Sequence, residues 1–397
     1  MSNIDSIRNF IISETKKSAR AAIKKELEDI NARPNTVSRG IEDVLGGGDA
    51  RLSNPKGIGF ANLMRCLAAA NGDATRALEY AEKTGSPETV QRALGAGTGT
   101  AGGFLVEGDL AAEVIDLLRA ASVVRKAGPL VISAPRGTKE FPKLTASATA
   151  GYVAENGDIP ASEQTFGSVT LSAKKLAALV PVSNELIQFA TPSADQVIRN
   201  DLIQVLASVE DQNFLRGDGT QNAPLGLLNQ ALPANVTASN GATSANVEAD
   251  FKDLIQDVEG KDVPLTKPVW FMNPRSKNHL LTLRDAINGA LTFPEIRGSN
   301  PTLFGWPVLT TTHIPVNLGA GTNETEVYFV DMSQVLLGEI ENVRIEVSRD
   351  AAYLDSGSVM RSAFTRDQTV MRIILQHDIG VRHPEAVAIK NAVTWGA

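Results

Sequence analysis

The strongest hydrophobic pattern in the chain lies between residues 193 and 216. Apolar side chains recur there at intervals of three and four, which is helical spacing and predicts one buried face. Roughly six turns at this spacing give a helix about 30 Å long. Ser193 is expected to cap its amino terminus, with Pro192 just outside, and Glu210 and Asp211 are expected on its solvent-exposed face. The apolar positions are Val197, Ile198, Leu202, Val205, Leu206 and Val209.

The predicted helix ends at a turn that reads Arg-Gly-Asp-Gly-Thr over residues 216–220. Gly217 and Gly219 permit the positive φ values that a sharp reversal needs. Asp218 between them has two interpretations: a cation ligand or, more commonly, an aspartate that accepts hydrogen bonds from its own turn. A long helix that ends in a rigid turn suits a spine on which other layers of the protein pack.

Helical patterns and irregular segments alternate at the amino-terminal end of the chain. Residues 3–32 carry a narrow apolar seam among many charges, which fits either a surface helix or a helix that pairs with a partner. Residues 33–58 are predicted to form a linker and residues 60–83 one helix. Ser86-Pro87-Glu88 is typical of a helix start, and that short helix is predicted to end near residue 94. Residues 95–103 contain the spacing G-x-G-x-x-G, but the segment before them is helical rather than a strand, which favours a hinge over a nucleotide-binding loop.

A polar stretch rich in small residues, 145–166, cannot supply much core of its own. We therefore predict a long β-hairpin or loop that projects from the body of the protein. Before it the pattern predicts a helix over 109–121 and strands over 123–131 and 139–144; after it the pattern predicts a strand over 168–183.

Short strands and helices alternate after the predicted spine, beyond a polar loop expected over 235–247. Their order indicates a small α/β unit, and the elements together indicate an α+β fold. The predicted helices are 251–258 and 276–284, and the predicted strands are 268–272, 303–309, 327–331, 335–340, 343–348, 369–377 and 384–389.

Composition narrows the class of protein. The chain has 397 residues, of which 43% are hydrophobic and 21% charged, which predicts a globular protein of two or three structural regions. Its formal net charge of −7 argues against a protein whose main task is to grip nucleic acid through a basic face. The single cysteine, Cys66, is expected to be a small buried hydrophobe on a helix. No signal peptide and no membrane span are predicted.

Candidate chemistry is sparse, and the sequence predicts no catalytic, cofactor or metal site. The spacings H-E-x-x-H and H-x-H, cysteine pairs and the G-x-S-x-G elbow do not occur. His377 and His383 fit one face of a strand but lack an acidic partner at ligand spacing. Glu339 and Glu341 alternate along a predicted strand, where we expect two solvated side chains rather than a catalytic pair. The histidines are His279, His313, His377 and His383.

Several stretches, taken in order, resemble the major capsid proteins of tailed bacteriophages of the Hong Kong 97 type. The resemblance covers about residues 100–394, roughly three quarters of the chain, and its specificity lies in the order and spacing of the stretches rather than in any single motif. The matching stretches are residues 102–106, 151–186, 214–220, 226–229, 273–275, 305–308 and 343–350.

The resemblance implies a Hong Kong 97-type capsid fold built from named parts. In this family a helical, scaffolding-like delta region is often removed by a phage protease, and the linker at 95–103 is then an expected place for the cut. The implied parts are the delta region 1–94, a flexible linker and N-arm 95–135, an extended loop 136–175, a peripheral domain with the spine helix 176–234 and 339–379, and an axial domain 235–338 and 380–397.

The resemblance also implies a function, that of a structural subunit without enzymatic activity. Such subunits assemble into pentamers and hexamers of an icosahedral head around double-stranded DNA, are made in the bacterial cytoplasm and end in the virion. A phage protease, a portal and a cement protein are the implied partners; a membrane and sequence-specific DNA contacts are not expected. The alternative is an encapsulin-like nanocompartment shell, which has the same fold and encloses enzymes instead of DNA.

Subunit contacts are expected at the extended loop. Family members that crosslink join a lysine of this loop to an asparagine of a neighbour, but here these positions read Ile159 and Asp367, and the assisting carboxylate position reads Ile374. We therefore expect a non-covalent shell held by many weak contacts, each surface ion pair contributing about 0–1 kcal/mol. The candidate contact residues of the loop are Tyr152, Glu155, Asp158, Ile159 and Glu163.

Overall fold

The computed structural model describes residues 58–70, 72–96, 104–105, 108–134, 137–146, 152, 165–185, 192–261, 263–355 and 357–397. The chain divides into two units, Met1–Pro55 and Lys56–Ala397, and everything below concerns the second. The helix predicted over 3–32, all but the last residue of the linker predicted over 33–58 and most of the predicted hinge at 95–103 lie outside the described residues.

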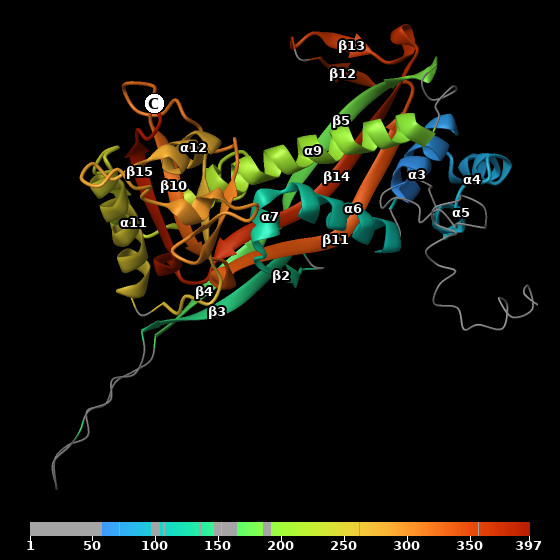
Figure 1. Ribbon diagram of the computed structural model, residues 1–397. Coiled ribbons are helices and arrows are strands. Elements are labelled where there is room, and N and C mark those ends of the chain that lie inside the picture. Colours follow the sequence, from blue (N-terminus) through green and yellow to red (C-terminus); the bar gives the residue numbers. More distant parts are fainter. Residues whose placement is uncertain are drawn as a thin grey trace, which may run out of the picture. The chain divides into compact units, whose positions relative to one another are not determined.

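A five-stranded sheet forms the long axis of this unit (Figure 1). Its main path is β1-β11-β14-β5, antiparallel throughout, and β2 pairs in parallel with β11. The strands predicted over 335–340 and 343–348 are one strand, whose register shifts between Ile340 and Arg344. The strands are β1 Phe104–Leu105, β2 Leu130–Ser133, β5 Lys174–Ser183, β11 Val335–Ser348 and β14 Gln368–Val381.

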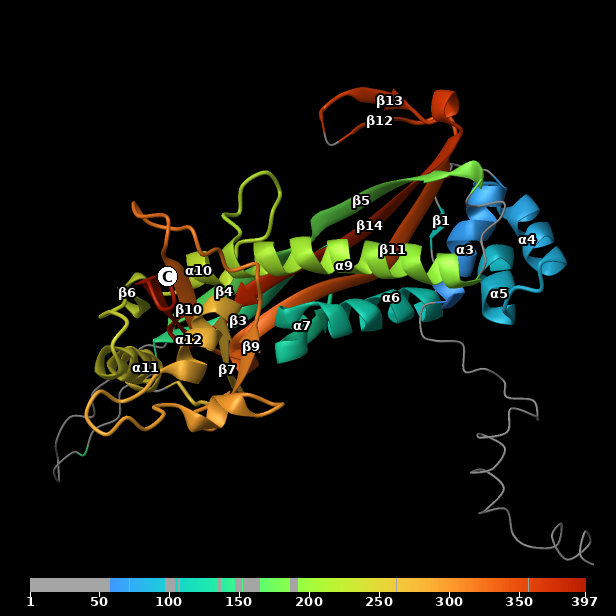
Figure 2. The same ribbon diagram turned by 45° about the horizontal axis from the view of Figure 1, so that its top comes forward.

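The predicted spine is helix α9, Pro192–Arg216, which lies along the long strands (Figures 1 and 2). Its start was predicted two residues too late: a cap at Ser193 makes residue 194 the first helical one, whereas Pro192 is the first, a position where proline loses no hydrogen bond. The predicted faces are partly wrong as well. Leu202 and Leu206 are buried, but Val205 is 50% exposed, while Glu210 and Asp211 are buried.

Three short helices, α3 Ile58–Ala69, α4 Ala74–Lys83 and α5 Glu88–Ala96, precede β1. The helix predicted over 60–83 is therefore two helices. Gly72 adopts a φ of 80° and Asp73 accepts a hydrogen bond from the amide of Thr75, so that one helix ends and the next begins. The prediction for α5 is confirmed, and Cys66 is buried on α3 as expected.

Helix α6, Gly108–Ala121, confirms the helix predicted over 109–121, but the strand predicted over 123–131 is mostly helix. Residues Val123–Ala127 form α7, with Ser122 at its amino-terminal cap and Gly128 in the left-handed conformation at its end. Only the last residues of the predicted strand belong to β2.

Strands β3 Thr138–Ala146 and β4 Thr165–Ser172 pair antiparallel on either side of the predicted projecting segment 145–166, most of which lies outside the described residues. Between them only Tyr152 is described. The single strand predicted over 168–183 is two strands in different sheets, β4 and β5, separated at Ala173. Leu171 of β4 packs over Gly338 and Gly380, where an added Cβ atom would lie 3.2 Å and 2.7 Å from its side chain. The two glycines therefore make room for the base of the hairpin on the sheet.

A second, six-stranded sheet has the order β6-β15-β10-β7-β9-β8. Its core contains the fully buried side chains of Phe251, Trp270 and Trp395. The polar loop predicted over 235–247 is wrong in part, because it contains β6 and the start of α11. The strand predicted over 384–389 begins with a 3-10 turn, Pro384–Ala386. The strands are β6 Val236–Ala238, β7 Pro268–Met272, β8 Thr302–Leu303, β9 Trp306–Thr310, β10 Thr325–Asp331 and β15 Val387–Val393; the helices here are α10 Leu227–Gln230, α11 Ser244–Glu259 and α12 Pro274–Thr282.

Candidate assembly surfaces and the junction that positions them

A buried ionic junction joins α7, the spine helix and the long sheet. The guanidinium of Arg125 forms ion pairs with Glu210 of α9 and Glu339 of β11, and all three side chains are almost fully buried. Burial alone would lower the pKa of Arg125, but the two carboxylates outweigh it and raise that pKa. One guanidinium cannot neutralise two buried carboxylates: burial raises the pKa of Glu210 to about 7, against the opposing effect of Arg125. The expectation that Glu339 is solvated is therefore wrong.

Asp211, the next residue of the spine helix, holds the amino terminus of α7. Its carboxylate accepts hydrogen bonds from the Ser122 hydroxyl at 2.7 Å, the Val123 amide at 2.8 Å and the Val124 amide at 3.0 Å. These are the donors that the first turn of a helix leaves unpaired, and a carboxylate there also complements the helix dipole. Two consecutive acidic residues thus fix α7 against the spine.

The loop after the spine helix closes on itself between residues 217 and 226. The amide of Gly226 donates to the carbonyl of Gly217 at 2.8 Å. Gly219 has the predicted positive φ, 75°, but Gly217 does not; glycine is needed there because a Cβ would lie 2.2 Å from the carbonyl oxygen of Pro224. Asp218 accepts from the amide and hydroxyl of Thr220, and these bonds lower its pKa.

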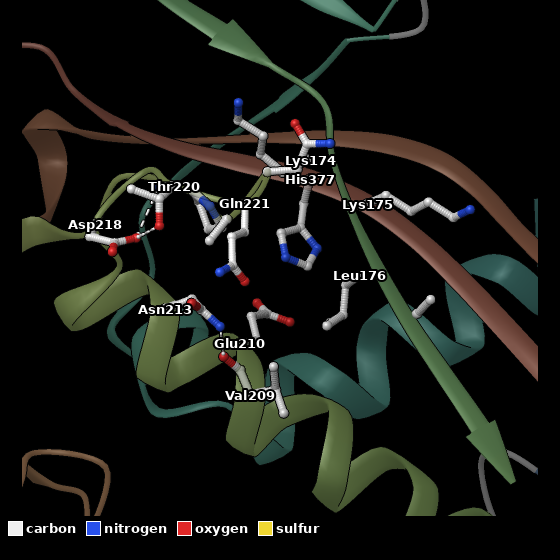
Figure 3. A pocket seen from close by; sticks show the side chains of 14 residues that line it. Lys174, Lys175, Leu176, Val209, Glu210, Asn213, Asp218, Thr220, Gln221 and His377 are labelled. Atoms are coloured by element: carbon white, nitrogen blue, oxygen red, sulfur yellow. Dashed lines mark hydrogen bonds between the residues drawn. The ribbon is translucent and has the colours of Figure 1, made fainter. Parts of the chain in front are cut away.

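A cavity of about 550 Å³ lies between this loop, the spine helix and β5. Figure 3 shows Glu210 and His377 pointing toward each other inside it, with Lys174 and Lys175 at β5. Burial, assisted by the charge of Arg125, lowers the pKa of His377 to about 3, so the ring is neutral at neutral pH. Its edge meets the ring of Phe214 at 5.1 Å between centroids, so it is packed as a core side chain.

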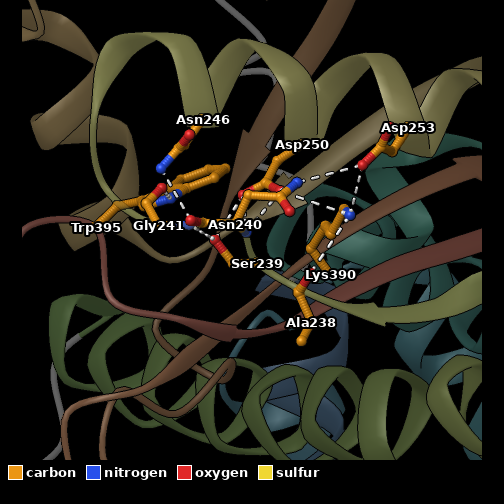
Figure 4. Close-up of polar contacts among 9 residues, drawn as sticks. All are labelled: Ala238, Ser239, Asn240, Gly241, Asn246, Asp250, Asp253, Lys390 and Trp395. Carbon is orange, nitrogen blue, oxygen red and sulfur yellow. Dashed lines mark hydrogen bonds and ion pairs between the residues drawn. The ribbon is translucent and has the colours of Figure 1, made fainter.

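A second buried ionic group stabilises the six-stranded sheet (Figure 4). The ammonium of Lys390 on β15 lies 3.0 Å from Asp253 and 3.5 Å from Asp250, both on α11. Asp250 also accepts from the Ser239 hydroxyl and the Asn240 amide. These contacts hold α11 and the loop after β6 against β15. The charged groups therefore have a structural role.

The sequence interpretation did not identify an exposed apolar tip on the hairpin of β12 Ala352–Leu354 and β13 Met360–Ser362. Leu354 and Met360, which pair across the hairpin beside its turn, are 63% and 67% exposed; Phe364, in the 3-10 turn that follows β13, is 77% exposed. Gathered apolar side chains at a surface mark a contact site. The sequence does not reveal this exposure, because apolar residues are equally expected in a buried core.

The predicted contact residues of the extended loop are only partly within the described residues. Tyr152 is described and fully exposed, whereas Glu155, Asp158, Ile159 and Glu163 lie outside. Of the other positions compared with crosslinking relatives, Asp367 has a φ of 48° and accepts from the Asn184 side chain, and Ile374 is buried. Within the described part of the chain no three His, Cys, Asp or Glu side chains gather in a way that could hold a metal ion.

A long helix on an antiparallel sheet, a projecting hairpin and a second sheet define a capsid subunit of the Hong Kong 97 type. Solved capsids share the fold: that of Microbacterium phage Oxtober96 matches with a TM-score of 0.54 and 20% identity over 69% of this chain and 91% of its own. The capsid of a native GTA particle computed with C5 symmetry matches with a TM-score of 0.52 and 15% identity over 68% of this chain and 90% of its own.

The family follows from the sequence comparisons. The phage capsid family matches residues 102–391, so the chain belongs to that family. The major capsid protein of Klebsiella oxytoca phage phiKO2 is 34% identical over 344 residues, which cover 85% of this chain and 79% of the relative. The chain is thus a major capsid protein of a phage shell and a component of the virion, in a family of structural, non-enzymatic proteins. Among the described helices, none combines the length and the apolar character of a membrane span.

Proposed function

We propose that this chain assembles through pentamers and hexamers into the icosahedral head of a phage or prophage, around double-stranded DNA. The β3–β4 hairpin carries the proposal because, of its side chains whose burial is described, only Leu171 at the base is buried in the monomer. Identical subunits that use such an arm make head-to-tail contacts, which close into rings. The C5 symmetry of the structurally similar GTA capsid supports pentamers.

The charge of the hairpin specifies where it lies on a neighbour. Between Lys143 and Lys174 the sequence has acidic residues and no lysine or arginine. The face of the long sheet away from the spine helix carries exposed basic residues on three adjacent strands, Lys175 on β5, Arg372 on β14 and Arg344 on β11. The strand register places them on one face. The hairpin of one subunit therefore lies over this face of the next.

A charge exchange tests this contact. The triple variant Glu155→Lys, Asp158→Lys and Glu163→Lys should fold normally and fail to form shells, and Lys175→Glu, Arg344→Glu and Arg372→Glu should do the same. Combining the two sets should restore shells seen by electron microscopy. Glu79→Lys, Glu82→Lys and Glu88→Lys, at exposed positions, change the charge by the same amount as the hairpin variant and serve as its control. Assembly that survives every reversal would refute the proposed contact.

The shell is proposed to be non-covalent, since the residues at the crosslinking positions, Ile159, Asp367 and Ile374, cannot form the lysine–asparagine bond. Shell protein from purified heads should then run as a monomer in denaturing gels. A separate cement protein, a portal and a phage protease are proposed partners, with synthesis in the host cytoplasm.

The net charge of −7 suits a container that encloses DNA without gripping it. Tight binding in a gel-shift assay at physiological salt would contradict this. The family match favours the phage head over a nanocompartment, and cargo enzymes rather than DNA inside purified particles would reverse that choice.

A further inference from the structure

The helices that precede β1 share one apolar core with the body of the subunit. Leu63 and Leu67 of α3 and Val90 of α5 are fully buried in the same cluster as side chains of the spine helix and the long sheet. Figure 2 shows α3, α4 and α5 gathered at the end of α9 and the long strands. The same cluster also includes Leu202, Leu206, Val343, Ile345, Met371 and Ile373 of the spine helix and the long sheet.

Polar contacts fix the same helices to β11. The guanidinium of Arg349, just after β11, donates to the carbonyl oxygens of Ala68 and Ala69 at 3.1 Å and 3.4 Å. A cation at a helix carboxyl terminus satisfies unpaired carbonyls and complements the dipole. At Gly72 the backbone comes so close to β11 that a Cβ would lie 3.1 Å from the carbonyl oxygen of Val347. The end of α3 is therefore fitted to this strand in detail.

These contacts have a consequence for any processing of the chain. A cut at residues 95–103, followed by loss of everything before it, would separate α3 from the spine helix and from strands β11 and β14, with which it is in contact, and would divide the apolar cluster they share. Soluble proteins rarely expose such a divided core, which would have to be covered again by another chain. The expected cut after the delta region therefore conflicts with the packing.

We infer that residues 58–96 are a permanent part of the shell subunit, and that any segment removed during assembly ends before Ile58. The inference rests on the proposed function, since it concerns the subunit in a finished shell. The division of the chain between Pro55 and Lys56 supports it.

The first test is the intact mass of the shell protein in heads purified from the producing host. The inference predicts a chain whose first residue is at or before Ile58, including the case of no processing at all. A chain that begins anywhere after Ile58 would overturn it. Failure to find shells would instead count against the proposed function, so the two failures are distinguishable.

The second test uses the full-length chain and does not depend on shells. Leu67→Ala and Leu206→Ala should each lower the melting temperature, and the double variant should lose clearly less than the two single losses added together, because both side chains belong to one buried apolar cluster. The control pair is Leu67→Ala with Leu254→Ala, which lies in the core of the six-stranded sheet; the two losses in melting temperature should add. Additive losses in both pairs, or no loss from Leu67→Ala, would overturn the inference.

If either leucine variant fails to fold, limited proteolysis of the unmodified chain replaces the comparison of single and double variants. Residues 58–96 should resist thermolysin as long as the body of the subunit does. Digestion of that segment while 108–397 remains intact would contradict a shared core.

Discussion

The carboxylate of Asp211 lies 2.7 Å from the hydroxyl of Ser122, although 89 residues separate them in the chain. Through this bond and two amide contacts the spine helix caps α7, and through Glu210 it also holds the Arg125 side chain of the same short helix. The segment that leads from α6 to the extended hairpin is thereby fixed to the spine by charged groups rather than by apolar packing alone. The stability of the folded subunit should therefore depend on the charges of Asp211, Glu210 and Arg125.

Replacing Asp211 with alanine should lower the free energy of unfolding by about 1–3 kcal/mol, because buried donors of α7 lose their acceptor. Chemical denaturation measures this directly. Asp218→Ala is the matched control: Asp218 is exposed and bonds only within its own turn among the described contacts, so its loss should be clearly smaller. Equal losses would mean that the cap contributes nothing beyond an ordinary surface aspartate.

The Glu210 carboxyl should make stability fall as pH rises. Its folded pKa, about 7, exceeds its ordinary value of 4.5, so the folded state holds the proton more tightly. That contribution is complete below pH 4.5 and is lost as pH rises through 7. The stability of Glu210→Gln relative to the unmodified chain should therefore increase between pH 5 and pH 8, by a change on the order of 3 kcal/mol over this range. The exposed Glu79→Gln should show no such trend, and a constant difference would contradict the prediction.

His377 should act in the opposite direction and at lower pH. Its pKa falls from 6.5 to about 3 on folding, so the unfolded chain binds the proton more readily. Stability is then lost as pH falls below 6.5, by on the order of 3 kcal/mol at pH 4. His377→Gln should flatten this acid limb of the stability curve, whereas His313→Gln, at a half-buried position, should not. An unchanged acid limb in His377→Gln would show that other groups control acid unfolding.

Local pattern predicted much of the fold, and its failures share one cause. The bounds of strand 268–272 and of the spine helix were predicted closely, because a short apolar run and a long segment without helix breakers are visible in their own residues. Helix α7 has five residues and depends on a cap from Asp211, a partner that no local pattern reveals. Glu210 and Glu339 were predicted to be solvated because charges usually are; they are buried because Arg125 comes to them from another part of the chain.

The loop after the spine helix was predicted as a turn with two strained glycines, and the structure separates their roles. Gly217→Ala should cost about 1–3 kcal/mol or more, since its Cβ meets the Pro224 backbone. Gly219→Ala should cost about 1–2 kcal/mol from its left-handed conformation alone. Gly95→Ala is the control: it lies in α5 with open space around it and should stabilise by up to about 1 kcal/mol. Thermal unfolding ranks the three, and a loss at Gly95 as large as that at Gly217 would contradict the geometry.

The most direct test of the account is electron microscopy of the full-length chain, expressed alone and examined over a range of concentrations. The account predicts closed shells of uniform diameter with pentameric and hexameric clusters. A chain that is folded by circular dichroism and yet remains in small soluble species at every concentration would contradict the claim that this subunit builds the shell by itself.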